Sequence, residues 1–210
     1  IANISGQPTK KEVFSMLEAA WEHGVRMFDT APSYGTERLL GEFFCSHGIS
    51  NEAKVLTKIP TVDSETNYKN VIQSSIQKSS DLLGVATNTV FFHDPKDSKL
   101  LRNDPGFFRM LLEADVTNNF GVSVYELHDV TNLRGCPNDL AFQYPYNIVD
   151  VRFQNIDVAK GKRYARSIFL QGLLASNDRL REHVPAYVGS FHKEYHAELL
   201  SRNISPVAFA

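Results

Sequence analysis

Three segments with the apolar character of buried strands each end in an ionisable side chain. These side chains are Asp29 in VRMFD, Lys58 in KVLTK and His93 in TVFFH, and a phenol follows the first of them at Tyr34. Because the carboxyl ends of parallel strands in a barrel meet at one mouth, we expect the four groups to converge on a common pocket. One polar residue at a strand end marks only the point where the strand reaches the surface. Four complementary groups at corresponding positions are typical of an active site.

The chemistry that suits this set is proton transfer to a carbonyl oxygen. A phenol such as Tyr34 is a usable acid only if its pKa falls below the ordinary value of about 10. An ammonium group at Lys58 would favour the phenolate, and Asp29 would keep that lysine charged and in place. His93 would donate a hydrogen bond to the substrate oxygen. The group fits delivery of a proton to oxygen while a hydride reaches carbon, or the reverse reaction.

Helical and extended patterns alternate along the sequence, which predicts a βα architecture that would position these residues. Thr36 and Ser64 are placed to cap two of the helices, and Pro206 to begin a last one in a largely helical tail. The polar stretch 94–106 is expected to be a loop. We expect helices over residues 9–24, 36–48, 64–84 and 107–115, and strands within residues 25–31, 54–59, 89–95, 119–126, 141–149 and 163–174.

The pattern predicts the α/β class and a (β/α)8 TIM barrel, seen incomplete. Such a barrel has eight strands and usually about 250 residues, whereas this sequence has 210 residues and six predicted strands. No strand precedes the first helix or follows the sixth strand. We therefore expect the first and last strands, which are neighbours around the ring, to be missing from a longer chain.

Composition describes an ordinary globular protein. The chain is 42% hydrophobic and 22% charged, with a formal net charge of -2. It shows neither the basic footprint of a nucleic-acid-binding protein nor the apolar run of about 20 residues that spans a bilayer. The N-terminus lacks the pattern of a signal peptide. We expect a single domain over residues 1–210 that is cytoplasmic and has no nucleic-acid or membrane partner.

Several conspicuous residues are assigned no chemistry. Cys45 and Cys136 are too few for a disulfide framework, and Cys45 is expected to pack among apolar neighbours on a helix. His192 and His196 have i, i+4 spacing but no third ligand, so we expect a solvated helix and no metal site. Tyr125 follows a predicted strand and could edge the pocket. Four aromatic residues are expected in the core, namely Phe91, Phe92, Phe107 and Phe108.

The segments GVRMFDTAPSYGTERLLG, LTK and FFHDP together resemble the aldo-keto reductases, which are (β/α)8 barrels that reduce aldehydes and ketones with a nicotinamide cofactor. The five-residue spacing from Asp29 to Tyr34 is that of the family. The resemblance implies a catalytic tetrad in which Tyr34 is the proton donor, Lys58 and Asp29 tune it, and His93 orients the substrate. The implied substrate is a small carbonyl compound.

The same resemblance implies a cofactor site. Ser123 in GVSVYE and Gln143 in FQYPYN match positions that hydrogen-bond the nicotinamide carboxamide. The segment RSIFLQGLL is similar to the family's segment over the cofactor phosphates, with backbone amides near Gln171, Gly172 and Leu173.

Arg166 departs from the family pattern. Many relatives have at this position a tyrosine that stacks on the nicotinamide ring, and an arginine can also stack through its planar face. The family's residues around the adenosine 2′-phosphate would lie beyond Ala210. NADP(H) is the cofactor that the resemblance implies, and the residues that choose between NADP and NAD are not in this sequence.

Two other functions remain open from the residues. Lys58 could form a Schiff base with a carbonyl substrate in a barrel aldolase. Alternatively, the barrel could bind the cofactor without catalysis, as a sensor or regulatory subunit. The spacing from Asp29 to Tyr34 favours the reductase.

Overall fold

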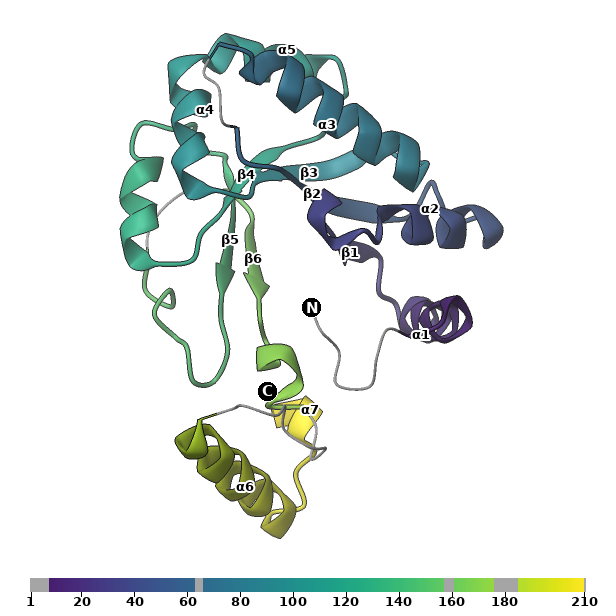
Figure 1. The fold of residues 1–210 in the computed structure, drawn as a ribbon, viewed down its shortest axis with the longest axis vertical. Coiled ribbons are helices and arrows are strands. Elements are labelled where there is room, and N and C mark those ends of the chain that lie inside the picture. Colours follow the sequence, from purple (N-terminus) through teal and green to yellow (C-terminus); the bar gives the residue numbers. More distant parts are fainter. Residues whose placement is uncertain (1–7, 63–65, 157–160, 176–184, 210) are drawn as a thin grey trace. The chain divides into compact units, whose positions relative to one another are not determined.

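The computed structural model describes residues 8–62, 66–156, 161–175 and 185–209 of the chain (Figure 1). The chain divides into two compact units. The larger unit comprises residues 7–143 and 157–164, and the smaller unit comprises residues 1–6, 144–156 and 165–210. The expectation of a single domain stays a prediction.

Six strands form one sheet in which each strand lies beside its neighbour in sequence. The pairs from β1 to β5 are parallel. The last two strands are parallel too, because their backbone hydrogen bonds progress in the same direction along both strands. Phe142 N donates to Lys162 O, and four residues later Tyr146 N donates to Arg166 O. This order is the one expected within a (β/α)8 barrel. The strands are β1 (Met27–Asp29), β2 (Lys54–Ile59), β3 (Thr87–Phe92), β4 (Phe120–Ser123), β5 (Ala141–Pro145) and β6 (Arg163–Arg166).

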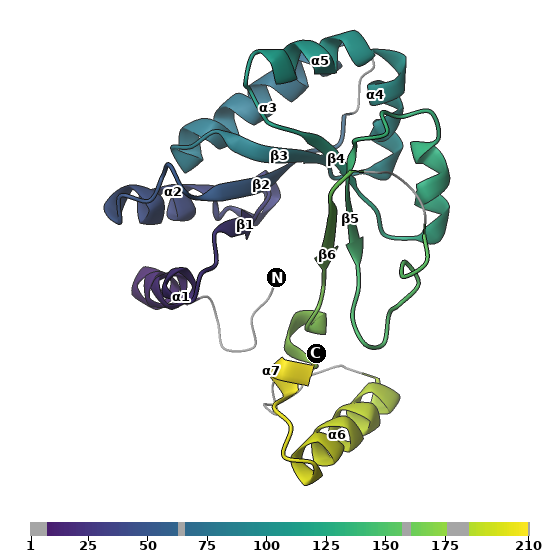
Figure 2. The ribbon, with the colours of Figure 1, turned by 180° about the vertical axis from the view of Figure 1, so that it is seen from behind.

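Helices follow the strands through the larger unit, and in both ribbon views α1, α2, α3 and α5 lie on one side of β1–β4 (Figures 1 and 2). The prediction that residues 94–106 form a loop is wrong in part, because the short helix Lys99–Asn103 forms within them. Pro206 begins the last helix, as predicted. The helices are α1 (Lys10–Glu22), α2 (Glu37–Ser46), α3 (Tyr68–Leu83), α4 (Lys99–Asn103), α5 (Pro105–Glu113), α6 (Ala186–Ser201) and α7 (Pro206–Phe209).

The N-termini of the first three helices differ in how they are capped. Thr9 and Glu12 form a capping box at α1, which satisfies the first backbone N–H groups. Thr36 does occupy the N-cap position of α2, but its hydroxyl pairs with the Thr30 hydroxyl at 2.8 Å and makes no cap bond. Asn67 is the N-cap residue of α3. The expected cap Ser64 lies outside the described residues.

The core of the larger unit lies between the helices and the strands. Phe28 of β1, Phe43 and Phe44 of α2 and Leu83 of α3 belong to one buried cluster. Trp21 of α1 packs against this cluster and stacks on Phe28 at 6.4 Å between ring centroids. All four aromatic residues predicted for the core, Phe91, Phe92, Phe107 and Phe108, are buried.

Gly41 allows α2 to approach α3 backbone to backbone. A Cβ atom at this position would lie 2.2 Å from Leu82 O and 2.9 Å from the Leu83 Cα. Any side chain larger than hydrogen would therefore push the two helices apart. Cys45, on the same helix, is exposed, so the prediction that it packs among apolar neighbours is wrong.

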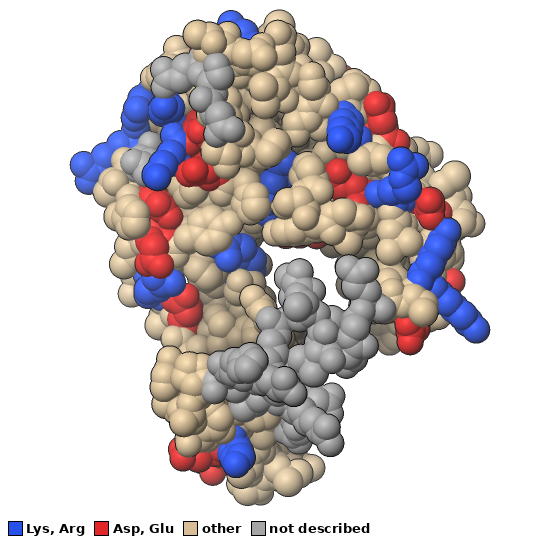
Figure 3. All heavy atoms as spheres, in the orientation of Figure 1, with Lys and Arg blue, Asp and Glu red and all other residues tan. Residues whose placement is uncertain are grey.

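The surface carries charges of both signs. On the face shown in Figure 3, Lys and Arg side chains are interspersed with Asp and Glu over the larger unit. Among the residues that the structure describes, no helix combines the length and apolar character needed to cross a bilayer. The expected absence of a nucleic-acid partner stays a prediction.

Candidate active site

Lys58 and Asp29 form an ion pair at the carboxyl ends of β2 and β1. Lys58 Nζ lies 2.9 Å from Asp29 Oδ1 and 3.2 Å from Oδ2, and it also donates to Thr30 O at 2.8 Å. The lysine side chain is 2% exposed and the aspartate side chain 38% exposed. A buried ammonium group is costly to keep unless carboxylate and carbonyl oxygens surround it, as they do here.

Tyr34 lies beside this ion pair. A short 3-10 turn, Pro32–Tyr34, follows β1 and ends at Gly35, whose φ of 68° falls in the left-handed region that glycine adopts readily. The turn places the Tyr34 ring centroid 5.1 Å from Lys58 Nζ. The tyrosine is 49% exposed, so its phenol is accessible from solvent while its ring contacts the lysine. The structure thus brings together three of the four residues of the expected tetrad.

Ser123 and Gln143 continue the hydrogen-bond network from Asp29. They are register partners, Ser123 at the end of β4 and Gln143 in the middle of β5, and both are buried. Gln143 Nε2 donates to Asp29 Oδ1 at 3.1 Å, and Ser123 Oγ donates to Gln143 Oε1 at 3.1 Å. The sequence predicted a role for each residue but not this link, because no local pattern joins residues 114 positions apart.

His93 follows β3 and lines an open hollow of about 320 Å³, here called the His93 hollow, at the carboxyl ends of the strands. Its ring centroid lies 6.4 Å from that of Tyr125, which follows β4. Asp129 accepts hydrogen bonds from the Tyr125 and Glu126 backbone N–H groups, which fixes the start of that loop. Tyr125 therefore edges the hollow, as the sequence predicted. The lining residues are Thr61, His93, Asp94, Pro95 and Tyr125.

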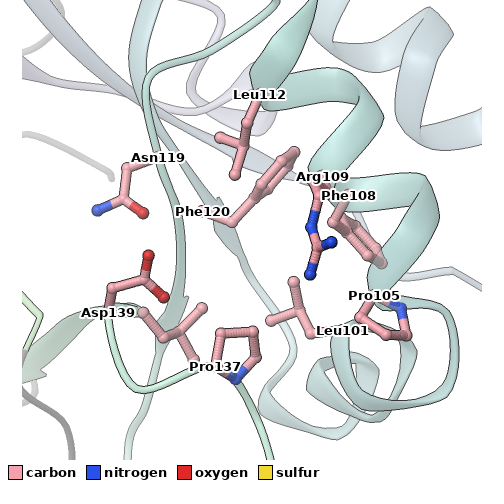
Figure 4. A pocket seen from close by; sticks show the side chains of 10 residues that line it. Leu101, Pro105, Phe108, Arg109, Leu112, Asn119, Phe120, Pro137 and Asp139 are labelled. Atoms are coloured by element: carbon pink, nitrogen blue, oxygen red, sulfur yellow. The ribbon is translucent and has the colours of Figure 1, made fainter.

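Another pocket, of about 180 Å³, lies at the amino-terminal ends of β4 and β5, with α5 on one side (Figure 4). Its lining is mainly apolar. Arg109 of α5 and Asp139, which precedes β5, stand on opposite sides of it (Figure 4). None of the site residues predicted from the sequence lines this pocket, so it is separate from the candidate active site. It is lined by Leu101, Pro105, Phe108, Arg109, Leu112, Asn119, Phe120, Pro137, Asp139 and Leu140.

In the smaller unit, the expected phosphate-binding segment is a tight turn after β6. Three successive residues have positive φ angles, namely Leu170 (45°), Gln171 (57°) and Gly172 (98°). Positive φ is unfavourable for leucine and glutamine, and such strain collects at functional sites. The Gly172 and Leu173 N–H groups donate within the turn to Phe169 O and Leu170 O. A phosphate bound by these two amides would therefore have to replace bonds within the turn.

Arg166 ends β6, and its carbonyl oxygen accepts a hydrogen bond from Tyr146 N at 3.0 Å. Its guanidinium Nη1 lies 3.4 Å from Ser167 Oγ. The strand and the turn that follows thus place the four residues expected from RSIFLQGLL within one short stretch of this unit.

His192 and His196 contradict the prediction of a solvated helix. Both are 7% exposed on α6, with ring centroids 4.4 Å apart. His196 Nε2 lies 3.1 Å from Leu173 O, so α6 packs on the turn through this ring. The i, i+4 spacing was the available signal, because it places two residues on one helical face. Among the described residues, no three His, Cys, Asp or Glu side chains form a possible metal site.

Comparison with known proteins relates this arrangement to one family. The model of the aldo/keto reductase family matches residues 1–184. None of the curated protein sequences compared with this chain matches it.

Three solved structures show the same fold. The glycerol dehydrogenase AKR11B4 from Gluconobacter oxydans has a TM-score of 0.71 at 20% identity, over 97% of this chain and 72% of that one. The aldo-keto reductase AKR11C1 from Bacillus halodurans has a TM-score of 0.65 at 18% identity, over 89% and 68%. An aldo-keto reductase from Klebsiella pneumoniae in complex with NADPH has a TM-score of 0.50 at 18% identity, over 65% and 49%.

Proposed function

Because the chain belongs to the aldo/keto reductase family, we propose that it interconverts carbonyl compounds and alcohols with NADP(H). The observation that carries this proposal is the ion pair of buried Lys58 with Asp29, next to the half-exposed Tyr34. A charged lysine held against a phenol ring suits proton donation to a carbonyl oxygen. The proposed substrate is a small aldehyde or ketone.

Tyr34 is the proposed proton donor. The Lys58 ammonium favours the phenolate over the phenol, so it eases loss of the proton to the developing alkoxide. Asp29 supports this effect because its carboxylate, 2.9 Å from Nζ, keeps the lysine charged and fixed. His93, at the hollow formed by the strand ends, would hold the carbonyl oxygen through a ring N–H. Proton donation by a positioned group contributes roughly a hundredfold to ten-thousandfold in rate.

Ser123 and Gln143 are the proposed nicotinamide ligands. A carboxamide has one acceptor oxygen and an NH2 donor, and a buried hydroxyl beside a buried amide offers the complementary set. When bound, the nicotinamide supplies or accepts the hydride. The NADPH in the related Klebsiella pneumoniae structure supports NADP(H) as the cofactor. Gln171, Gly172 and Leu173 are the proposed phosphate ligands.

Arg166 is the proposed stacking partner of the nicotinamide ring, since its planar guanidinium can lie flat against an aromatic face. It is the last residue of β6. The carboxyl ends of the strands are where (β/α)8 barrels bind their ligands.

The aldolase alternative fits the geometry less well. A Schiff base requires a neutral amine that a substrate can reach. Lys58 is 2% exposed and donates to both Asp29 oxygens and to Thr30 O, which favours a fixed ammonium group.

The testing experiment is a titration of the protein with NADPH and, separately, NADH, followed by nicotinamide emission. We expect saturable binding with the tighter constant for NADPH, and NADPH-dependent loss of a panel of small aldehydes. Absence of binding by both cofactors would overturn the proposal. Binding without turnover of any aldehyde or ketone would favour a non-catalytic cofactor-binding protein.

A further inference from the structure

Asp29 Oδ1 is shared by two donors from different strands. It accepts from Lys58 Nζ at 2.9 Å and from Gln143 Nε2 at 3.1 Å. Gln143 in turn accepts from Ser123 Oγ at 3.1 Å. One carboxylate therefore joins the proposed proton-transfer group to the proposed nicotinamide ligands.

The orientation of the Gln143 amide follows from its partners. A glutamine can present either its NH2 group or its carbonyl oxygen toward a neighbour, and the hydrogen-bond network decides which. The Asp29 carboxylate can only accept, so the NH2 group must face β1. The carbonyl oxygen then faces Ser123, whose hydroxyl donates to it. Because Gln143 is 2% exposed, water competes little for these positions.

We propose that Asp29 is a positioning residue for cofactor binding, in addition to holding Lys58. It fixes the Gln143 amide in the orientation that presents the second Nε2–H to the carboxamide oxygen of the nicotinamide. This inference rests on the proposed function. It assigns to Asp29 an effect on cofactor affinity that is separate from its effect on the lysine.

The first test compares Asp29→Asn with Lys58→Met in NADPH binding. An asparagine can offer either an acceptor or a donor, so it no longer fixes the orientation of the Gln143 amide. We therefore expect the Kd for NADPH to rise about tenfold, which is the loss expected for one hydrogen bond to a charged group. Lys58→Met breaks the same ion pair but leaves the Asp29–Gln143 bond, so its Kd should stay within about twofold of wild type. Equal weakening in both variants would overturn the inference.

The second test reverses the polarity of the bond. Gln143→Glu places two carboxylates face to face and should weaken NADPH binding. Adding Asp29→Asn to that variant restores an amide-to-carboxylate bond in the opposite direction. The same substitution should thus weaken binding in the wild-type background and tighten it in the Gln143→Glu background. Effects that simply add would show that the two side chains act independently.

A third measurement needs neither substitution nor cofactor. In the free wild-type protein, NMR should detect a through-hydrogen-bond coupling between Gln143 Nε2 and the Asp29 carboxyl carbon. Absence of this coupling would overturn the inference even if the variants fail to fold. A wild-type protein that binds neither NADPH nor NADH would overturn the proposed function and this inference together. Wild-type binding with unchanged affinity in Asp29→Asn would overturn the inference alone.

Discussion

Lys58 reaches Asp29 because it lies two residues beyond the strand partner of Asp29. The register pairs Asp29 with Leu56, and side chains two apart on a strand share a face of the sheet. Thr57 points to the other face, where its hydroxyl donates to the buried Glu37 of α2 at 2.8 Å. The alternation on β2 thus sends the lysine to the candidate site and the threonine to the helix layer.

Lys58→Met should abolish most turnover without preventing cofactor binding. The substitution removes the charge beside Tyr34, and the rate of carbonyl reduction at neutral pH should fall by about a hundredfold or more. Thr30 O loses a donor, which should lower the free energy of unfolding by about 1–3 kcal/mol. Single-turnover rates and urea denaturation would check the two effects. A variant with wild-type turnover would show that Lys58 is only structural.

Tyr34→Phe should leave the fold and the cofactor affinity close to wild type, because the ring is kept and the residue is half-exposed. Turnover should fall by about a hundredfold to ten-thousandfold, since only the proton donor is lost. The measurement is kcat for an aldehyde alongside the Kd for NADPH. If turnover persists, another residue is the acid.

Gly41→Ala should destabilise the protein whereas Gly106→Ala should not, although both glycines are helical. The added Cβ at position 41 would lie 2.2 Å from Leu82 O, and the required shift of α2 should cost about 1–3 kcal/mol. At position 106 the nearest atom, Asp104 Oδ1, is 3.8 Å away. Alanine there should be neutral or stabilising by up to about 1 kcal/mol. Thermal denaturation of the two variants would measure both effects. Equal unfolding midpoints for the two variants would contradict the close packing of α2 on α3.

Asp104 should make stability depend on pH in acid. Hydrogen bonds from Lys69, Tyr68 and the Phe107 N–H lower the pKa of its carboxyl group to about 2. Because the pKa of Asp104 is lower in the folded protein than its unfolded value of about 3.9, the ionised carboxylate stabilises the fold at pH values above that unfolded pKa. This stabilisation is lost as the pH falls toward 2. Asp104→Asn keeps a side-chain acceptor for the Phe107 N–H at the N-cap of α5, but it removes the charge and the oxygen that accepts from Tyr68 and Lys69.

The difference in unfolding free energy between wild type and Asp104→Asn should be constant from pH 7 to 5 and should shrink between pH 4 and 2. Urea denaturation at several pH values measures it. The same difference at pH 3 as at pH 7 would argue against the lowered pKa.

The parts of the candidate site that could be predicted from the sequence are those that depend on the local pattern of apolar and charged residues. Asp29 and Lys58 each end an apolar run, and a run that ends in a charge marks the end of a strand. Their convergence followed from the parallel order of the strands, which the βα alternation predicted.

What the sequence could not predict depends on contacts between distant segments. The Thr36 hydroxyl had two possible partners, and the choice of Thr30 over the α2 backbone is a tertiary contact. The burial of His196 likewise depends on where α6 packs, since its partner is Leu173 O on the turn after β6. Hydrophobic periodicity carries no information about either choice.

Trp21 is the one tryptophan of the chain, and it packs in the larger unit against Phe28, with the Arg26 guanidinium 3.8 Å from its ring centroid. Its fluorescence therefore reports the unfolding of the helices and strands around α1. The smaller unit contributes tyrosine but no tryptophan emission. Far-UV circular dichroism, in contrast, also detects α6. If the denaturation curves from the two signals coincide, both units unfold in one cooperative step. If the curves separate, each unit has its own stability.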